Sequence, residues 1–175
     1  PFSLSAAPDE RTLRFPVKAL GDDTAVLGRL PLGTPVMAEG PYGVFTAARA
    51  AAGRVLLVGA GIGIAPIKAL IEELPQAPGD AAVLYRARRR EEAPLLEEIA
   101  ALARGRGYPF FVSYSRGANP APDPLRPEVL RRAIPDIATR TVFVCGPTAM
   151  IDRARSGLRA AGVPRSRIVY ERFGY

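Results

Sequence analysis

Three glycines alternate at the end of an apolar run, at Gly59, Gly61 and Gly63, and Pro66 follows them. A strand, a glycine-rich turn and a helix in this order let backbone amides approach a diphosphate at the positive end of the helix. The spacing is G-x-G-x-x-P, which lacks the third glycine of the standard dinucleotide fingerprint. A turn without a ligand therefore stays open as an alternative, because glycine loops alone are weak evidence.

A second candidate lies at Cys145, Gly146 and Pro147, where another apolar run ends. Ligands of open parallel sheets bind at the carboxyl ends of strands. Gly146 would permit close approach of the backbone to a ligand, and Cys145 would point its sulfur into the same crevice. Free cysteine is also often a small buried core residue, so a packing role for Cys145 stays open.

A third candidate is the segment 40–46, G-P-Y-G-V-F-T, which precedes the first of these apolar runs. Gly-Pro and Tyr-Gly also occur in ordinary turns. By itself this segment is equally consistent with a binding loop and with an ordinary turn.

The elements that must position these residues alternate from Arg54 onward, with short β-branched runs separated by helical patterns. This rhythm predicts an α/β fold, a doubly wound five-stranded parallel sheet. The strands are expected at residues 54–58, 82–86, 110–114, 141–145 and 167–170. The helices are expected at residues 66–74, 94–103, 127–133 and 149–161.

The first 46 residues lack this rhythm and predict strands at residues 1–6, 13–19 and 35–39, with a short helix at 24–29. Three strands cannot close a barrel or cover both of their edges, so the segment is expected to be an incomplete antiparallel β-barrel fragment. We place the domain boundary between residues 48 and 49.

Composition removes several mechanisms. The chain has 175 residues, a net charge of +7, one cysteine and no histidine, which excludes a histidine base, a Ser-His triad and histidine-ligated haem or zinc within it. No metal site is expected. The basic residues lack interleaved aromatics, so nucleic acid is not an expected partner. A single cysteine and no apolar run of roughly 18 residues favour a cytoplasmic location. The chemistry must come largely from a cofactor.

Together with the terminal segments P-F-S-L-S and E-R-F-G-Y, the three candidates resemble the ferredoxin-NADP reductase superfamily, in particular its ferric reductase and NADPH oxidase-like branch. The resemblance implies that FAD and NADPH are the cofactors, and that residues 1–48 are the truncated end of an FAD-binding domain. It places the flavin ring at Phe2 and Ser3, under a cover formed by Phe173. It places the FAD diphosphate at Gly43, Val44, Phe45 and Thr46. It places the nicotinamide nucleotide at Gly59, Gly61, Ile62, Gly63, Pro66, Cys145, Gly146 and Pro147.

The implied reaction is hydride transfer from reduced nicotinamide to flavin N5, followed by release of single electrons. Ser3 and Cys145 would tune the contact between the rings, and Phe173 would be displaced by nicotinamide. Glu171 is a candidate for a proton path, although it could equally be a solvated charge.

NADPH is the expected donor because no acidic residue follows the second expected strand until Glu91. Arg86, Ser115 and Arg116 could instead hold a 2′-phosphate. The alternative is that Arg116 only caps a loop.

The acceptor is expected to take one electron at a time, as would ferric iron or the haem of a transmembrane domain upstream. The chain would then be the cytosolic part of a membrane protein. A soluble flavin or oxygenase reductase and a noncatalytic nucleotide-binding module remain as alternatives.

Overall fold

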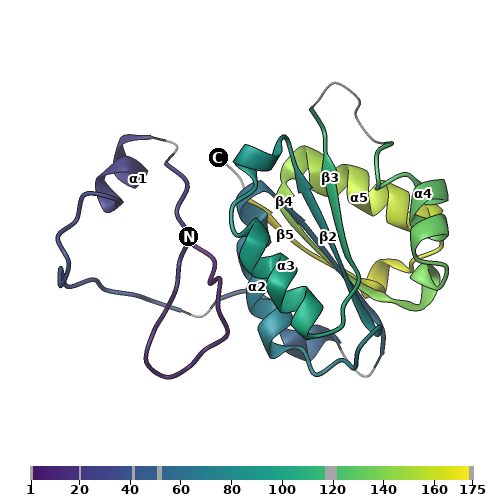
Figure 1. Ribbon diagram of the computed structural model, residues 1–175, viewed down its shortest axis with the longest axis horizontal. Helices are drawn as coiled ribbons and strands as arrows, with labels where there is room; N and C mark the ends of the chain where they lie inside the picture. The colour runs from purple at the N-terminus through teal and green to yellow at the C-terminus, as the bar shows by residue number, and fades with distance from the viewer. Residues whose placement is uncertain (1, 20, 41, 51–52, 117–121, 174–175) are drawn as a thin grey trace.

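The nucleotide-binding part is a five-stranded parallel sheet, which confirms the predicted α/β class (Figure 1). The computed structural model describes residues 2–19, 21–40, 42–50, 53–116 and 122–173. The strand order is β3-β2-β1-β4-β5, so the chain starts in the middle of the sheet and winds outward in both directions. The strands are β1 (Val55–Ala60), β2 (Ala81–Ala87), β3 (Phe110–Tyr114), β4 (Thr141–Pro147) and β5 (Ile168–Phe173).

Helices cover both faces of this sheet (Figure 1). One face carries α2 (Ile64–Glu73) and α3 (Leu96–Gly105), and the other carries α4 (Pro127–Ala133) and α5 (Thr148–Ala160). In β1 the side chains alternate: Leu57 joins the core under α2 and α3, and Leu56 joins the core under α4 and α5. Short 3₁₀ turns complete the connections at η1 (Ala47–Ala50), η2 (Gly61–Gly63), η3 (Arg90–Glu92), η4 (Ile137–Thr139) and η5 (Arg165–Arg167).

Every strand and helix predicted after residue 53 forms, with ends that shift by a few residues. The largest change is at β5, which was expected to end at Tyr170 but continues to Phe173. The strand is longer because residues 171–173 pair with the last three residues of β4, and Phe173 lies opposite Pro147. Phe173 is therefore the end of a strand rather than a free terminal aromatic.

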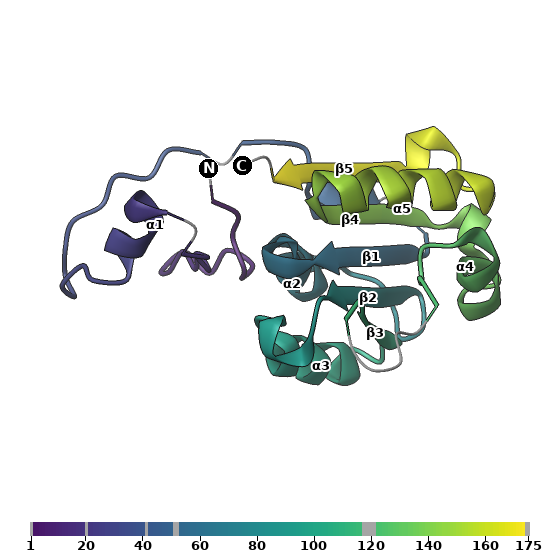
Figure 2. The same cartoon turned by 90° about the horizontal axis from the view of Figure 1, so that it is seen from above.

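The three strands predicted in the first 46 residues are wrong for the part of that segment that the structure describes. Of the four elements expected there, the short helix is confirmed as α1 (Asp22–Leu27). A strand needs a neighbour for its backbone groups, and here the pairing reduces to one bond, from the Ser5 amide to the Arg14 carbonyl at 2.9 Å. The segment extends away from the sheet (Figure 2) and leaves Leu32 and Met37 fully exposed.

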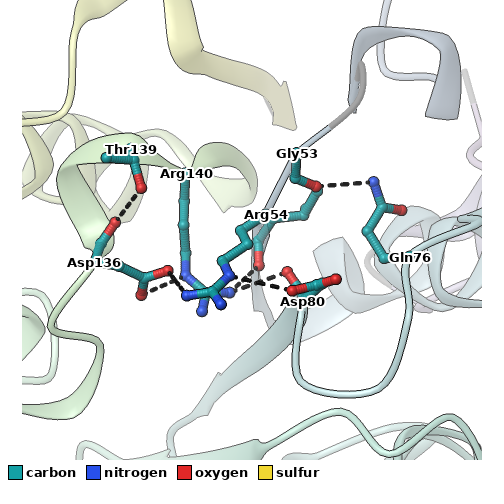
Figure 3. A network of polar contacts seen from close by, with 8 residues as sticks. Gly53, Arg54, Gln76, Asp80, Asp136, Thr139 and Arg140 are labelled. Atoms are coloured by element: carbon teal, nitrogen blue, oxygen red, sulfur yellow. Dashed lines mark hydrogen bonds and ion pairs between the residues drawn. The ribbon is translucent and has the colours of Figure 1, made fainter.

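An arginine network joins the amino ends of the three central strands (Figure 3). Arg140, which is 6% exposed, donates to the carbonyls of Val55 and Asp80 at 3.0 and 3.1 Å and to the Asp136 carboxylate at 2.9 Å. Arg54 bridges the carboxylates of Asp80 and Asp136 at 3.1 and 2.9 Å. Arg54, Asp80 and Arg140 each immediately precede a strand. The amino ends of the central strands are thus tied together by structural ion pairs.

Candidate functional site

A cavity of about 280 Å³ lies where the amino-terminal segment meets the carboxyl ends of the strands. In Figure 2 the arrowheads of β1, β2 and β5 point toward the side on which that segment lies. The volume is close to the lower end of the roughly 300–1,000 Å³ that small-molecule sites occupy. The lining residues are Phe2, Ser3, Pro16, Val17, Lys18, Gly21, Asp22, Asp23, Thr24, Ile62, Ala65 and Phe173.

Two segments far apart in the sequence meet beside this cavity through Ser3 and Glu171. The Ser3 hydroxyl donates a hydrogen bond to Glu171 Oε1 at 3.2 Å. Glu171 pairs in register with Cys145 across β4 and β5, which places Cys145 directly beside it in the sheet. The structure therefore brings together the four residues singled out for chemistry: Ser3, Cys145, Glu171 and Phe173.

Cys145 does not point its sulfur into an open crevice, as the sequence had suggested. Its side chain is fully buried in the core under α2 and α3, with the rings of Phe45 and Phe173 packed against that core. Burial, followed by the charge of Glu171, raises the pKa of the thiol well above its ordinary value. Cys145 is consequently a neutral thiol beneath the site.

The glycine loop divides into packing and open positions. A Cβ at Gly63 would lie 2.5 Å from the Cys145 carbonyl oxygen, so this glycine lets η2 approach β4. Gly61 has a φ of +54° and a Cβ there would meet nothing within 4 Å. Gly61 therefore faces open space at the start of η2, the turn directly before α2, and the amino end of such a helix can receive an anion.

The other residues predicted to bind the nicotinamide nucleotide differ in their environments. Gly59 packs against Ile64, and Pro66 is buried in the first turn of α2. Ile62 lines the cavity. Gly146 is buried at the end of β4, and Pro147 is exposed opposite the last residue of β5.

Residues 43–46 lie outside the cavity lining. Gly43, Val44 and Thr46 are exposed, whereas Phe45 packs edge-on against Phe143 of β4, with ring centroids 5.3 Å apart. Phe45 thus anchors this segment on the sheet and leaves its neighbours free to face a ligand.

The candidate phosphate residues lie at the ends of β2 and β3. The amides of Ser115 and Arg116 donate to the carbonyls of Ala87 and Arg88 at 3.0 and 2.9 Å, which holds both residues beside β2. Both are exposed, and within the described residues the Arg116 side chain makes no ion pair. Arg86 lies 20% exposed at its side chain.

Asp123 is the residue that sequence reasoning missed here. It accepts an ion pair from Arg86 at 3.2 Å and another from Arg153. A proline-rich stretch predicts a loop but not where its one acid points, so the sequence held no signal for this contact. Of the three candidate residues, Arg86 is therefore neutralised by Asp123, whereas the Arg116 side chain has no ion-pair partner among the residues that the structure describes.

The cavity also includes polar residues that no motif had indicated, namely Lys18, Asp22 and Asp23 around the start of α1. Charged residues in a short helix resemble any solvated surface in sequence. The lining also includes two aromatic side chains, Phe2 and Phe173, which could pack against a planar ring system.

Comparison with known proteins shows the family to which the chain belongs. Residues 57–156 match the family described as the oxidoreductase NAD-binding domain. Ferredoxin--NADP reductase B of Sorangium cellulosum is 32% identical over 191 residues, which cover 98% of this chain and 77% of that protein. The reductase component of propane 2-monooxygenase from Rhodococcus jostii is 30% identical over 154 residues, covering 82% of this chain and 42% of that protein.

Solved structures share the fold. The FAD/NAD-binding domain of nitric oxide dioxygenase from Vibrio cholerae superposes with a TM-score of 0.75 at 24% identity, covering 99% of this chain and 76% of that one. The flavohemoglobin of Malassezia yamatoensis, solved with bound FAD and heme, superposes with a TM-score of 0.71 at 25% identity, covering 99% of this chain and 46% of that chain.

The chain belongs to the ferredoxin-NADP reductase-like superfamily of FAD- and NAD(P)-binding oxidoreductases. It spans only about half the length of the first monooxygenase reductases that it matches, 42%, 53% and 45% of each. Within the described residues, no helix has both the length and the apolar character needed to cross a bilayer.

Proposed function

We propose that the protein carries electrons from NADPH through FAD to an acceptor that takes them one at a time. The observation that carries this proposal is the contact of Ser3 with Glu171 beside a cavity that Phe2, Ile62 and Phe173 share. The segment expected to hold the flavin and the loop expected to hold the nicotinamide thus line one space. In this assignment residues 1–48 belong to the flavin domain and residues 49–175 to the nucleotide domain.

When bound, FAD supplies the chemistry that side chains cannot, since it accepts a hydride and releases electrons singly. The protein would position the two cofactors and exclude water from the space between them. Phe173 shields the cavity from solvent at the end of β5. Ser3 keeps its hydroxyl oriented by donation to Glu171, whose half-buried carboxylate can hand a proton between that hydroxyl and the solvent. Cys145 is neutral and buried, and it packs in the core beneath these groups.

The open face at Gly61 suits the diphosphate of the nicotinamide nucleotide, because it exposes the positive end of α2. Ser115 and Arg116 suit a 2′-phosphate, since the Arg116 side chain is exposed and, within the described residues, makes no ion pair that would compete with a bidentate anion contact. This favours NADPH over NADH as donor.

The acceptor is proposed from the relatives. The similarity to a monooxygenase reductase component and to a flavohemoglobin solved with heme supports an oxygenase or haem acceptor, in a separate protein or another domain. A haem-bearing transmembrane domain or ferric iron, as in the ferric reductase-like branch, is the alternative. A cytosolic location accords with either.

The test uses the full-length protein. It should retain FAD after gel filtration and reduce cytochrome c with NADPH, and Ser3→Ala should lower kcat about 10-fold through loss of a hydrogen bond to a charged group. Ser166→Ala, in the exposed turn η5, is the matched control and should leave kcat unchanged. Protein that binds no FAD, or a Ser3→Ala variant as active as wild type, would contradict the proposal.

A further inference from the structure

A buried lysine fastens the amino-terminal segment to α2. Lys68 is 6% exposed, although α2 has an exposed position nearby at Glu73. Its Nζ donates to the Ser5 carbonyl oxygen at 3.1 Å and to Glu72 Oε1. Burying an ammonium group costs free energy unless it is paired and hydrogen-bonded, and an apolar residue would pack at this position at less cost.

The contacts around Lys68 form a network that we call the Lys68 clasp, consisting of Lys68, Glu72, Glu98 and Arg14. Glu98 Oε2 lies 3.9 Å from Lys68 Nζ, and the two terminal nitrogens of Arg14 each donate a hydrogen bond to the Glu98 carboxylate, at 2.6 and 2.9 Å. Two cations face two carboxylates, so the clasp is neutral. It joins α2, α3 and the amino-terminal segment.

The segment also gives its backbone to the clasp. The Ala7 amide donates to Glu72 Oε2 at 2.8 Å, and the Ser5 carbonyl accepts from Lys68. Ser5 is itself fully buried. One turn of α2 therefore holds a backbone donor and a backbone acceptor that are two residues apart. Two such contacts fix the direction of the amino-terminal segment at this point as well as its distance from α2.

The clasp is continuous with the cavity. Ala65, Lys68 and Glu72 lie three and four residues apart, along one stripe of α2. Ala65 lines the cavity together with Ser3, and Ser3 is two residues before Ser5. Fixing Ser5 thus sets where Ser3 meets Glu171.

We propose that Lys68 is a positioning residue that holds Phe2 and Ser3 in register with the nucleotide-binding domain. This inference rests on the proposed function, because it assigns Lys68 to the alignment of the two cofactor-binding segments. Lys68 touches neither the glycine loop nor Arg116, so it should act on the rate of electron transfer and not on nucleotide affinity.

The experiment compares Lys68→Met, Lys68→Arg and Arg14→Met in the full-length, FAD-containing protein with the control Glu73→Gln, whose side chain is exposed on the same helix. Amide hydrogen exchange is measured for residues 4–14, and flavin bleaching by NADPH is followed in an anaerobic stopped-flow instrument. Arg14→Met opens the clasp from its half-exposed end, so it keeps the test valid if Lys68→Met does not fold.

Lys68→Met and Arg14→Met should speed exchange at Ser5 and Ala7 by about 10-fold or more, the effect of one charge-assisted hydrogen bond. The limiting rate of flavin bleaching should fall while the Kd for NADP⁺ stays constant. Lys68→Arg, which keeps the cation, should recover most of both properties. Glu73→Gln should match wild type.

Unchanged exchange at Ser5 and Ala7 would overturn the anchoring role, and faster exchange with an unchanged bleaching rate would overturn the positioning role. A wild type that takes no electrons from NADPH would contradict the proposed function instead. The exchange data, which need no turnover, would then still decide whether Lys68 anchors the segment.

Discussion

The Ser3 hydroxyl donates to Glu171 at 3.2 Å, although the two residues are 168 positions apart in the chain. This bond ties the amino-terminal segment, which contains Ser3, to β5, which contains Glu171 and is an edge strand of the sheet. Displacement of either terminal segment would open the cavity. The following predictions concern the full-length protein.

Arg116→Ala should weaken the use of NADPH specifically. Loss of a charge-assisted contact to the 2′-phosphate is expected to cost roughly 1.5–3 kcal/mol in kcat/KM for NADPH and little for NADH. Steady-state kinetics with both donors would measure it, with Arg104→Ala, an exposed arginine of α3, as control. Equal losses with the two donors would argue that Arg116 only stabilises its loop.

Phe173→Ala should free the space that nicotinamide must enter. Because a covering side chain competes with the ligand, its removal is expected to tighten NADP⁺ binding by about 10-fold and to reduce discrimination between NADPH and NADH. Difference spectroscopy during NADP⁺ titration would report the Kd. Tyr170→Ala, in the same strand but stacked under Arg155 outside the cavity, should leave it unchanged. If both variants bind like wild type, Phe173 serves packing alone.

Arg140→Met should destabilise the nucleotide-binding domain. The substitution leaves the Val55 and Asp80 carbonyls and the Asp136 carboxylate without their buried donor, which is expected to cost about 3 kcal/mol. Urea unfolding would measure the free energy, and Arg165→Met, exposed in η5, is the control. A loss below about 1 kcal/mol, the range of surface ion pairs, would mean that the network contributes little.

The Lys68 clasp should weaken in acid. The hydrogen bond from Arg14, aided by the charge of Lys68, lowers the pKa of Glu98 below its usual value of 4.5. A carboxyl with a lower pKa in the folded state stabilises the fold at pH values above 4.5, and this contribution is lost as the pH falls through the folded pKa. The difference in unfolding free energy between wild type and Glu98→Gln should therefore shrink from pH 7 to pH 3. A difference that grows in acid would contradict the assigned direction.

The sequence predicted the sheet because the central strands are mostly apolar runs between turn residues, as in Val55–Ala60. It could not predict the path of residues 2–46, since a strand depends on a neighbour that no local pattern reveals. It also could not orient Cys145. Both faces of β4 are covered by helices, so the alternation of polar and apolar residues that would have marked one face is missing.

The measurement that tests the central claim most directly is anaerobic mixing of the FAD-loaded, full-length protein with one equivalent of NADPH. The flavin absorbance near 450 nm should bleach fully in one turnover, and each reduced flavin should then reduce two equivalents of cytochrome c, since electrons leave singly. A flavin that stays oxidised after mixing with NADPH, and also in a parallel experiment with NADH, would contradict the account.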